Sequence, residues 1–150
     1  FFGWGDNAAQ QKVLAEYFVP KIIKKFKPKY VLDVGCGTGQ WLDEYRKYNV
    51  ITKGIEGSSN AWHIMSDKTK EVVLKRDLRD KIEEEDYNID FVQSFEVAEH
   101  IEEEFANVFI HNIIKDNDYL FNQDLLNEIK DWGTPDDCPF WWHSNLMVFA

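Results

Sequence analysis

The stretch that decides the fold is residues 30–39, which read Tyr30-Val31-Leu32-Asp33-Val34-Gly35-Cys36-Gly37-Thr38-Gly39. β-favouring residues lead into an acid, glycine then occupies every second position, and a helical pattern comes next. This order predicts a buried strand, a tight turn and the start of a helix. Glycine suits the turn because it tolerates positive φ and lets a ligand approach the backbone closely. Free N–H groups at the helix start are expected to face polar or anionic ligand atoms.

Composition predicts a single domain over residues 1–150 with its own core. The hydrophobic fraction is 44%, which excludes a disordered or a membrane-embedded chain. No apolar run is long enough to span a bilayer, and no basic-then-apolar signal opens the chain, so we expect no membrane partner. Cys36 and Cys138 suggest no disulfide framework, so a reduced, cytoplasmic protein is expected.

The charge balance argues against a nucleic-acid partner. The chain carries 27 acids against 17 bases, for a net charge of −10, and such an excess repels phosphates. The densest basic run, residues 21–27, is spaced like one solvated face of a helix. A small molecule or a sugar is therefore the better expectation.

The remaining elements alternate as in an α/β protein. Residues 1–28 predict a helical cap, in which Pro20 either ends one helix or begins a second. A helix is expected after Gly39, and further strands are expected at residues 50–57, 71–78 and 87–95.

Acids stand at the ends of two of these strands. Glu56 comes about twenty positions after Gly35, the spacing of ribose-binding carboxylates in nucleotide folds. Asp77 lies near the end of the third strand. The alternatives are a helix-capping or exposed Glu56 and a turn-forming Asp77. Strand tips of this kind are where open α/β sheets bind ligands.

Residues 33–39 resemble motif I of the class I S-adenosylmethionine (SAM)-dependent methyltransferases, which has an acid, one residue and then alternating glycines. A nicotinamide-binding unit favours G-x-G-x-x-G, and here the third glycine comes one residue too early. The resemblance implies SAM as cofactor. It also implies a role for each matching residue: Asp33, Gly35, Gly37 and Gly39 hold the methionine part, Glu56 the ribose, Asp77 and Leu78 the adenine, and Phe95 lines the donor pocket.

Residues 96–101 come after the fourth strand and resemble the Glu-Val-x-Glu-His segment of many small-molecule methyltransferases. This resemblance implies His100 and Glu99 as catalytic candidates. If the segment is helical, Glu96, Glu99 and His100 share one side and could bind a divalent metal. The same set resembles that of the small-RNA 2′-O-methyltransferases, which need a further histidine; His111 and His143 lie in no matching motif. The alternative is an acid in a first helical turn and a histidine that orients loops.

Beyond residue 113 the chain departs from this family. A fifth strand and helix are not visible there, so we expect the sequence to lack a stretch near residues 113–118. The C-terminal residues predict a sixth strand at 119–121, an inserted helix through 125–132 and a last strand at 145–150.

The expected fold is therefore a doubly wound, Rossmann-like α/β sheet, mostly parallel with an antiparallel last strand. The expected activity is SAM-dependent O- or N-methylation of a small molecule or sugar. The alternatives are a metal-dependent RNA 2′-O-methyltransferase and a non-catalytic SAM-binding relative. The sequence does not specify the oligomeric state.

Overall fold

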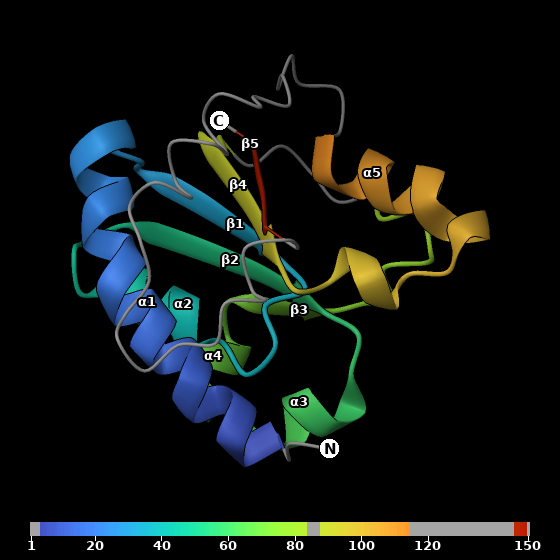
Figure 1. Cartoon of the computed structure of the whole chain (residues 1–150), viewed down its shortest axis with the longest axis horizontal. Helices are drawn as coiled ribbons and strands as arrows, with labels where there is room; N and C mark the ends of the chain where they lie inside the picture. Colours follow the sequence, from blue (N-terminus) through green and yellow to red (C-terminus); the bar gives the residue numbers. More distant parts are fainter. Residues whose placement is uncertain (1–3, 84–87, 115–145, 150) are drawn as a thin grey trace.

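The computed structural model describes residues 4–83, 88–114 and 146–149, which form a five-stranded sheet with helices on both faces (Figure 1). The strand order is β3-β2-β1-β4-β5. The strands are β1 (Tyr30–Val34), β2 (Ile51–Glu56), β3 (Val73–Lys75), β4 (Phe91–Phe95) and β5 (Leu146–Phe149). The α/β fold is the predicted one.

The first four strands are parallel, and β5 pairs antiparallel with β4. Because β5 lies directly beside β4, the described part of the sheet has no parallel strand between them. The register of β1 and β4 is supported at its start by Asp90, whose carboxylate accepts hydrogen bonds from the backbone N–H groups of Lys29 and Tyr30.

Two strands are shorter than predicted. β3 begins at Val73 because residues 67–70 form the short helix α4 (Asp67–Lys70), and the N–H of Glu71 still donates to the carbonyl of Asp67. β4 begins at Phe91, just after Asp90, and Tyr87 lies outside the described residues.

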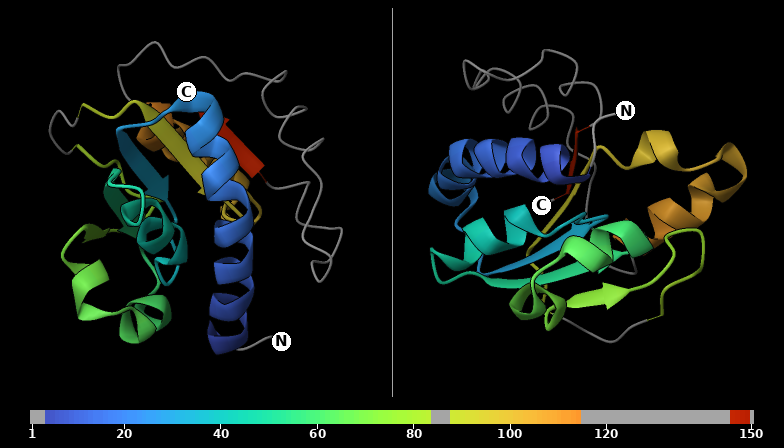
Figure 2. Two further views of the ribbon diagram at one scale, coloured as in Figure 1. Left: turned by 90° about the vertical axis from the view of Figure 1, so that its left-hand side faces the viewer. Right: turned by 90° about the horizontal axis from the view of Figure 1, so that it is seen from below.

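One continuous helix, α1 (Trp4–Phe26), covers one face of the sheet (Figure 2). The expected break at Pro20 is therefore wrong. Proline costs the helix one hydrogen bond, but Phe18, Val19 and Ile22 are buried on both sides of it and hold the two halves in line. Tertiary packing here overrides the local helix-breaking tendency.

The sheet separates two apolar layers. Between α1, α2 (Gln40–Arg46) and the sheet lie Leu14, Ala15, Phe18, Val19, Ile22, Val31, Trp41, Tyr45, Val50 and Phe91. On the opposite face, α5 (Ala106–Ile114) packs with Leu32, Val34, Ile55, Leu78, Ile82, Val92, Phe109 and Ile113. This alternation along β1 is what a strand buried on both faces requires.

Three short helices carry the connections near the strand tips. α3 (Ser59–Ile64) comes after β2, and the 3₁₀ helices η1 (Ala98–His100) and η2 (Glu103–Phe105) come after β4. The side-chain oxygen of Ser58 accepts from the N–H of Ala61 at 3.3 Å, so Ser58 caps α3.

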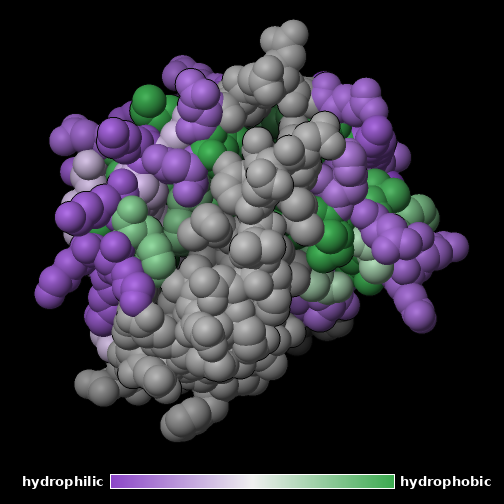
Figure 3. Space-filling view, turned by 90° about the horizontal axis from the view of Figure 1, so that it is seen from above, coloured by the Kyte–Doolittle hydropathy of each residue, from purple (hydrophilic) through white to green (hydrophobic). Residues whose placement is uncertain are grey.

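Several expectations fall on residues that the structure does not describe. The predicted sixth strand, the inserted helix and the missing stretch after Ile114 lie within or next to residues 115–145. Within the described part, no helix has both the length and the apolar character needed to cross a bilayer. Figure 3 shows hydrophilic side chains on both flanks of the molecule seen from above.

Candidate functional site

The glycine turn connects the tip of β1 to α2, and all three of its glycines have positive φ: 79° at Gly35, 54° at Gly37 and 84° at Gly39. The turn is closed by its own backbone. The N–H groups of Gly35 and Cys36 donate to the carbonyl of Ile55, and that of Gly39 donates to the carbonyl of Cys36. Together with the N–H of Gly37, which Glu56 accepts, these donors are satisfied within the protein. The expectation of free donors concerned the start of α2, and these four amides lie before that helix.

The three glycines differ in what surrounds them. A Cβ at Gly35 would lie 2.3 Å from Cγ2 of Val97, and one at Gly39 would lie 2.3 Å from Cγ2 of Thr69. At Gly37 no other atom comes within 4 Å of the Cβ position. Gly35 and Gly39 thus allow neighbouring segments to pack on the turn, and Gly37 leaves room for a ligand.

Glu56, at the tip of β2, holds this turn. Its Oε2 accepts from the N–H of Gly37 at 2.7 Å, and its Oε1 accepts from the N–H of Ser58 at 2.6 Å. Burial raises the pKa of Glu56, and the N–H groups of Ser58 and Gly37 partly oppose the rise. The alternative of an exposed Glu56 is therefore wrong, and the carboxylate joins the glycine turn to the start of α3. Each oxygen keeps a second lone pair for a ligand.

Asp33 lies beside Gln93, its register partner across β1 and β4, and is 1% exposed. Burial raises the pKa of Asp33 to about 7; the side chain of Gln93 opposes the rise and the charge of Glu56 adds to it. Tyr45 on α2 donates to Oε1 of Gln93 at 2.9 Å. Among the described residues, however, Oδ2 of Asp33 and Nε2 of Gln93 have no hydrogen-bond partner. A buried acceptor of this kind is costly unless a ligand satisfies it.

Asp77 lies next to the tip of β2. A Cβ at Gly57 would come 3.2 Å from Cα of Asp77, and the N–H of Arg76 donates to the carbonyl of Glu56. Arg79 donates two hydrogen bonds to the carboxylate of Asp77, one from Nε at 2.9 Å and one from Nη2 at 2.6 Å. These hydrogen bonds lower the pKa of Asp77.

Arg79 also reaches Glu102 at 3.5 Å, so it ties the loop after β3 to the segment after β4. Leu78 is turned into the apolar layer on the α5 face and is 7% exposed. Sequence reasoning did not find Arg79, because its pairing depends on which rotamers bring the charges together.

The segment after β4 does not form the helix that would place Glu96, Glu99 and His100 on one side for metal binding. Glu96 has φ 58° and so sits in the left-handed region, and only Ala98–His100 form a turn of 3₁₀ helix. The predicted common face of Glu96, Glu99 and His100 is therefore wrong. A non-glycine residue with this φ is strained, and such strain is found at functional sites. Phe95, just before it, stacks on Trp41 with ring centroids 4.2 Å apart.

Glu96 is a partly buried acid of this segment. Burial, and then the charge of Glu99, raise its pKa to about 7, and among the described residues its Oε1 atom has no hydrogen-bond partner. His100 lies 3.9 Å from Glu99, and 76% of its side chain is exposed. Within the described ranges, no group of three or more His, Cys, Asp or Glu residues is placed to hold a metal ion.

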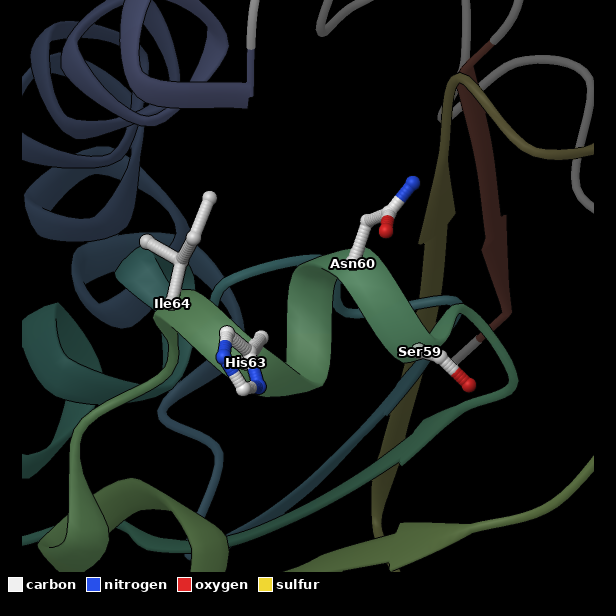
Figure 4. A pocket seen from close by; sticks show the side chains of 4 residues that line it. All are labelled: Ser59, Asn60, His63 and Ile64. Carbon is white, nitrogen blue, oxygen red and sulfur yellow. The ribbon is translucent and has the colours of Figure 1, made fainter.

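α3 carries an open hollow of about 580 Å³ close to the end of β2, lined by Ser59, Asn60, His63 and Ile64. Asn60 and Ile64 project from the same side of the helix (Figure 4). The hollow lies on the surface.

A parallel sheet whose strand tips carry a glycine turn and buried acids defines the Rossmann-like nucleotide-binding class. Residues 7–147 match the family model described as "Methyltransferase domain". The chain therefore belongs to the methyltransferase-domain family, in agreement with the resemblance of residues 33–39.

Solved structures agree on the fold. The chain is similar to magnesium protoporphyrin IX methyltransferase from Synechocystis, crystallised with bound SAM (TM-score 0.56, 17% identity, covering 96% of this chain and 79% of that one). It is also similar to the PH0226 protein from Pyrococcus horikoshii (TM-score 0.57, 20% identity, 89% and 72% covered).

A third similar structure is the methyltransferase domain of bacterial CtHen1-CN (TM-score 0.54, 20% identity, 73% of this chain covered). Here the chain spans only 61% of the length of the related structure. Among curated proteins, none is significantly similar in sequence.

Proposed function

We propose that this protein transfers a methyl group from SAM to an oxygen or nitrogen of a small molecule or sugar. The observation that carries the proposal is the buried Oδ2 of Asp33, which has no hydrogen-bond partner among the described residues and stands in β1 just before the turn that Gly37 and Glu56 form. A cationic ligand with several donors satisfies such acceptors, and SAM carries both an ammonium and a ribose.

The residues at the tips of β1 and β2 fit the cofactor. Gly37 offers open space next to the backbone, Glu56 keeps lone pairs for ribose hydroxyls, and Asp33 offers an acceptor to the methionine part. Asp77 and Leu78 lie on the neighbouring loop, where they would hold the adenine. Asp77 then shares its carboxylate between Arg79 and the ligand, because a carboxylate has about four acceptor positions.

When bound, SAM supplies a methyl group that is already a good electrophile, so the protein mainly has to align the acceptor and exclude water. A base is needed only for a neutral acceptor. His100 and Glu99 remain our candidates for this role. Glu96 joins them because its pKa of about 7 means that both the ionised and the protonated carboxyl are present near neutral pH, and the ionised form can accept a proton.

The acceptor class is argued from charge. A net charge of −10 disfavours polyanionic acceptors, and the segment at residues 96–101 resembles that of small-molecule methyltransferases. Cys36 is buried as a thiol, in keeping with our proposal of a cytoplasmic protein. The RNA and the non-catalytic alternatives become outcomes of the test.

Calorimetry with SAM and with its demethylated product tests the cofactor. Gly37→Ala places a Cβ in the open space of the turn, and Asn49→Ala is the matched control, since Asn49 also has a left-handed φ of 59° but lies away from the strand tips. We expect binding by the wild type and the control, and binding at least about tenfold weaker in Gly37→Ala. No binding by the wild type overturns the proposal.

A methyl-release assay then compares small hydroxyl and amine acceptors with RNA, with and without Mg²⁺. Turnover of a small acceptor supports the proposal, and its loss in Glu96→Gln or His100→Gln identifies the base. Mg²⁺-dependent turnover of RNA, abolished by Glu99→Ala, establishes the RNA alternative instead. Binding without any turnover establishes the non-catalytic one.

A further inference from the structure

Asn112 is a fully buried polar residue on α5, and its side chain makes three hydrogen bonds, all to the backbone of one loop. Its Oδ1 accepts from the N–H of Ile82 at 2.9 Å, and its Nδ2 donates to the carbonyls of Leu78 at 3.1 Å and Asp80 at 2.9 Å. The exposed fraction of Asn112 is 0%. One side chain therefore fixes the path of residues 78–82.

This loop begins at the tip of β3, beside Glu56 and Gly57. The N–H of Asp80 donates to the carbonyl of Asp77 at 3.2 Å, which closes a turn directly after the acid. Below the turn, Leu78 and Ile82 are buried in the apolar layer against α5. Asn112 therefore holds, from the α5 side, the turn that follows Asp77 near the strand tips.

A short carboxamide side chain matches these three backbone groups. Asparagine has one accepting oxygen and an NH₂ group that can donate twice, which matches one N–H and two carbonyls. Aspartate would keep the bond to Ile82 but face two carbonyls with a buried negative charge. An apolar residue would leave all three backbone groups unpaired, at a cost typical of buried polar groups.

Packing alone does not explain this residue. Phe109 and Ile113 already anchor α5 to the sheet through apolar contacts. Asn112 lies between them in sequence, and its hydrogen bonds reach away from its own helix to a loop at least thirty positions earlier. Its contacts hold the backbone of residues 78–82 from the α5 side, and Arg79 joins the same loop to Glu102.

We propose that Asn112 is a positioning residue for adenine recognition, which acts by holding the backbone of residues 78–82 so that Asp77 and Leu78 meet the base. The inference rests on the proposed function, because it takes the loop after β3 as the adenine-binding loop. It assigns Asn112 no contact with the ligand and no part in methyl transfer.

The test compares two ligands that differ only in the base: S-adenosylhomocysteine and S-inosylhomocysteine, in which an oxygen replaces the adenine amino group. Affinities are measured by calorimetry for the wild type, Asn112→Ala and Asn112→Asp. Phe91→Leu is the control, because Phe91 is a fully buried residue at the start of β4, whereas the loop lies near the strand tips at the other end of the sheet. It lowers stability without touching the loop.

We expect the wild type to prefer the adenine ligand and the preference to fall about tenfold or more in both Asn112 variants, as the loss of one well-oriented hydrogen bond predicts. Phe91→Leu should keep the wild-type preference. A merely structural role for Asn112 would weaken both ligands equally and leave their ratio unchanged, and that result overturns the inference.

A measurement on the wild type covers the case in which the variants fail to fold. Hydrogen exchange at the N–H of Ile82 should slow when S-adenosylhomocysteine binds, because the ligand stabilises the loop that Asn112 holds. Unchanged exchange at Ile82 in a protein that binds the ligand overturns the inference. A wild type that binds neither ligand instead overturns the proposed function.

Discussion

The Oε2 atom of Glu56 accepts a hydrogen bond of 2.7 Å from the backbone N–H of Gly37. The last residue of β2 thereby holds the middle of the turn after β1. The other oxygen of the same carboxylate accepts from Ser58, at the start of α3. Two connections that the sequence separates by about twenty residues thus depend on one side chain.

Replacing Glu56 by glutamine should loosen one of these two connections. An amide has only one accepting oxygen, so one of the two N–H groups would face an NH₂ group, at a cost of about 1–3 kcal/mol in the free energy of unfolding. Urea unfolding measures this loss, and calorimetry should show weaker SAM binding. Glu44→Gln is the control: Glu44 is also buried, but it pairs with Lys47 on α2. Equal effects of the two substitutions on SAM affinity would contradict this role of Glu56.

Alanine should have unequal effects at the three glycines of the turn. At each of them a left-handed φ costs alanine about 1–2 kcal/mol. Gly35→Ala and Gly39→Ala add a collision with Val97 or Thr69, and overpacking of this kind costs about another 1–3 kcal/mol. Thermal unfolding should therefore rank Gly37→Ala as the mildest for stability, even though it weakens SAM binding. A Gly37 variant as unstable as the other two would show that the open space is absent.

Asp33 should make the stability depend on pH. With its pKa raised from 3.8 to about 7, the folded protein retains a proton that the unfolded chain has already released. Stability therefore falls as pH rises through this window and levels off above it. Urea unfolding between pH 4 and 8 should show this decline in the wild type relative to Asp33→Asn. Parallel curves for the two proteins would mean that Asp33 is ionised in the folded state.

The fold was predictable where its signals are local. The strand, the acid and the glycines of residues 30–39 are adjacent, and each favours the same geometry, so β1, the turn and α2 could be predicted from the sequence. Glu56 was placed correctly at the tip of β2 because its spacing from the turn reflects one strand-helix-strand unit. Whether these residues bind SAM as assigned is still a prediction.

Other features depend on contacts between distant segments. Pro20 indicates a break locally, but α1 continues through it, and buried residues stand on both sides of it. Glu96 fits a helical pattern, yet its left-handed φ reflects the packing of Val97 against Gly35. Asn112 did leave a signal that sequence reasoning missed: of the two asparagines of α5, it is the one at helical spacing from the apolar Phe109.

Cys36, in the middle of the turn, has one more consequence. Its sulfur lies against β2, where a Cβ on Gly54 would approach it to 2.7 Å, and burial together with the charges of Asp33 and Glu56 raises the pKa of the thiol. Thiolate is the reactive form, so alkylating reagents are shut out while the turn is closed. The rate at which an alkylating reagent labels Cys36 therefore reports how often the turn opens, and no additional cysteine has to be introduced.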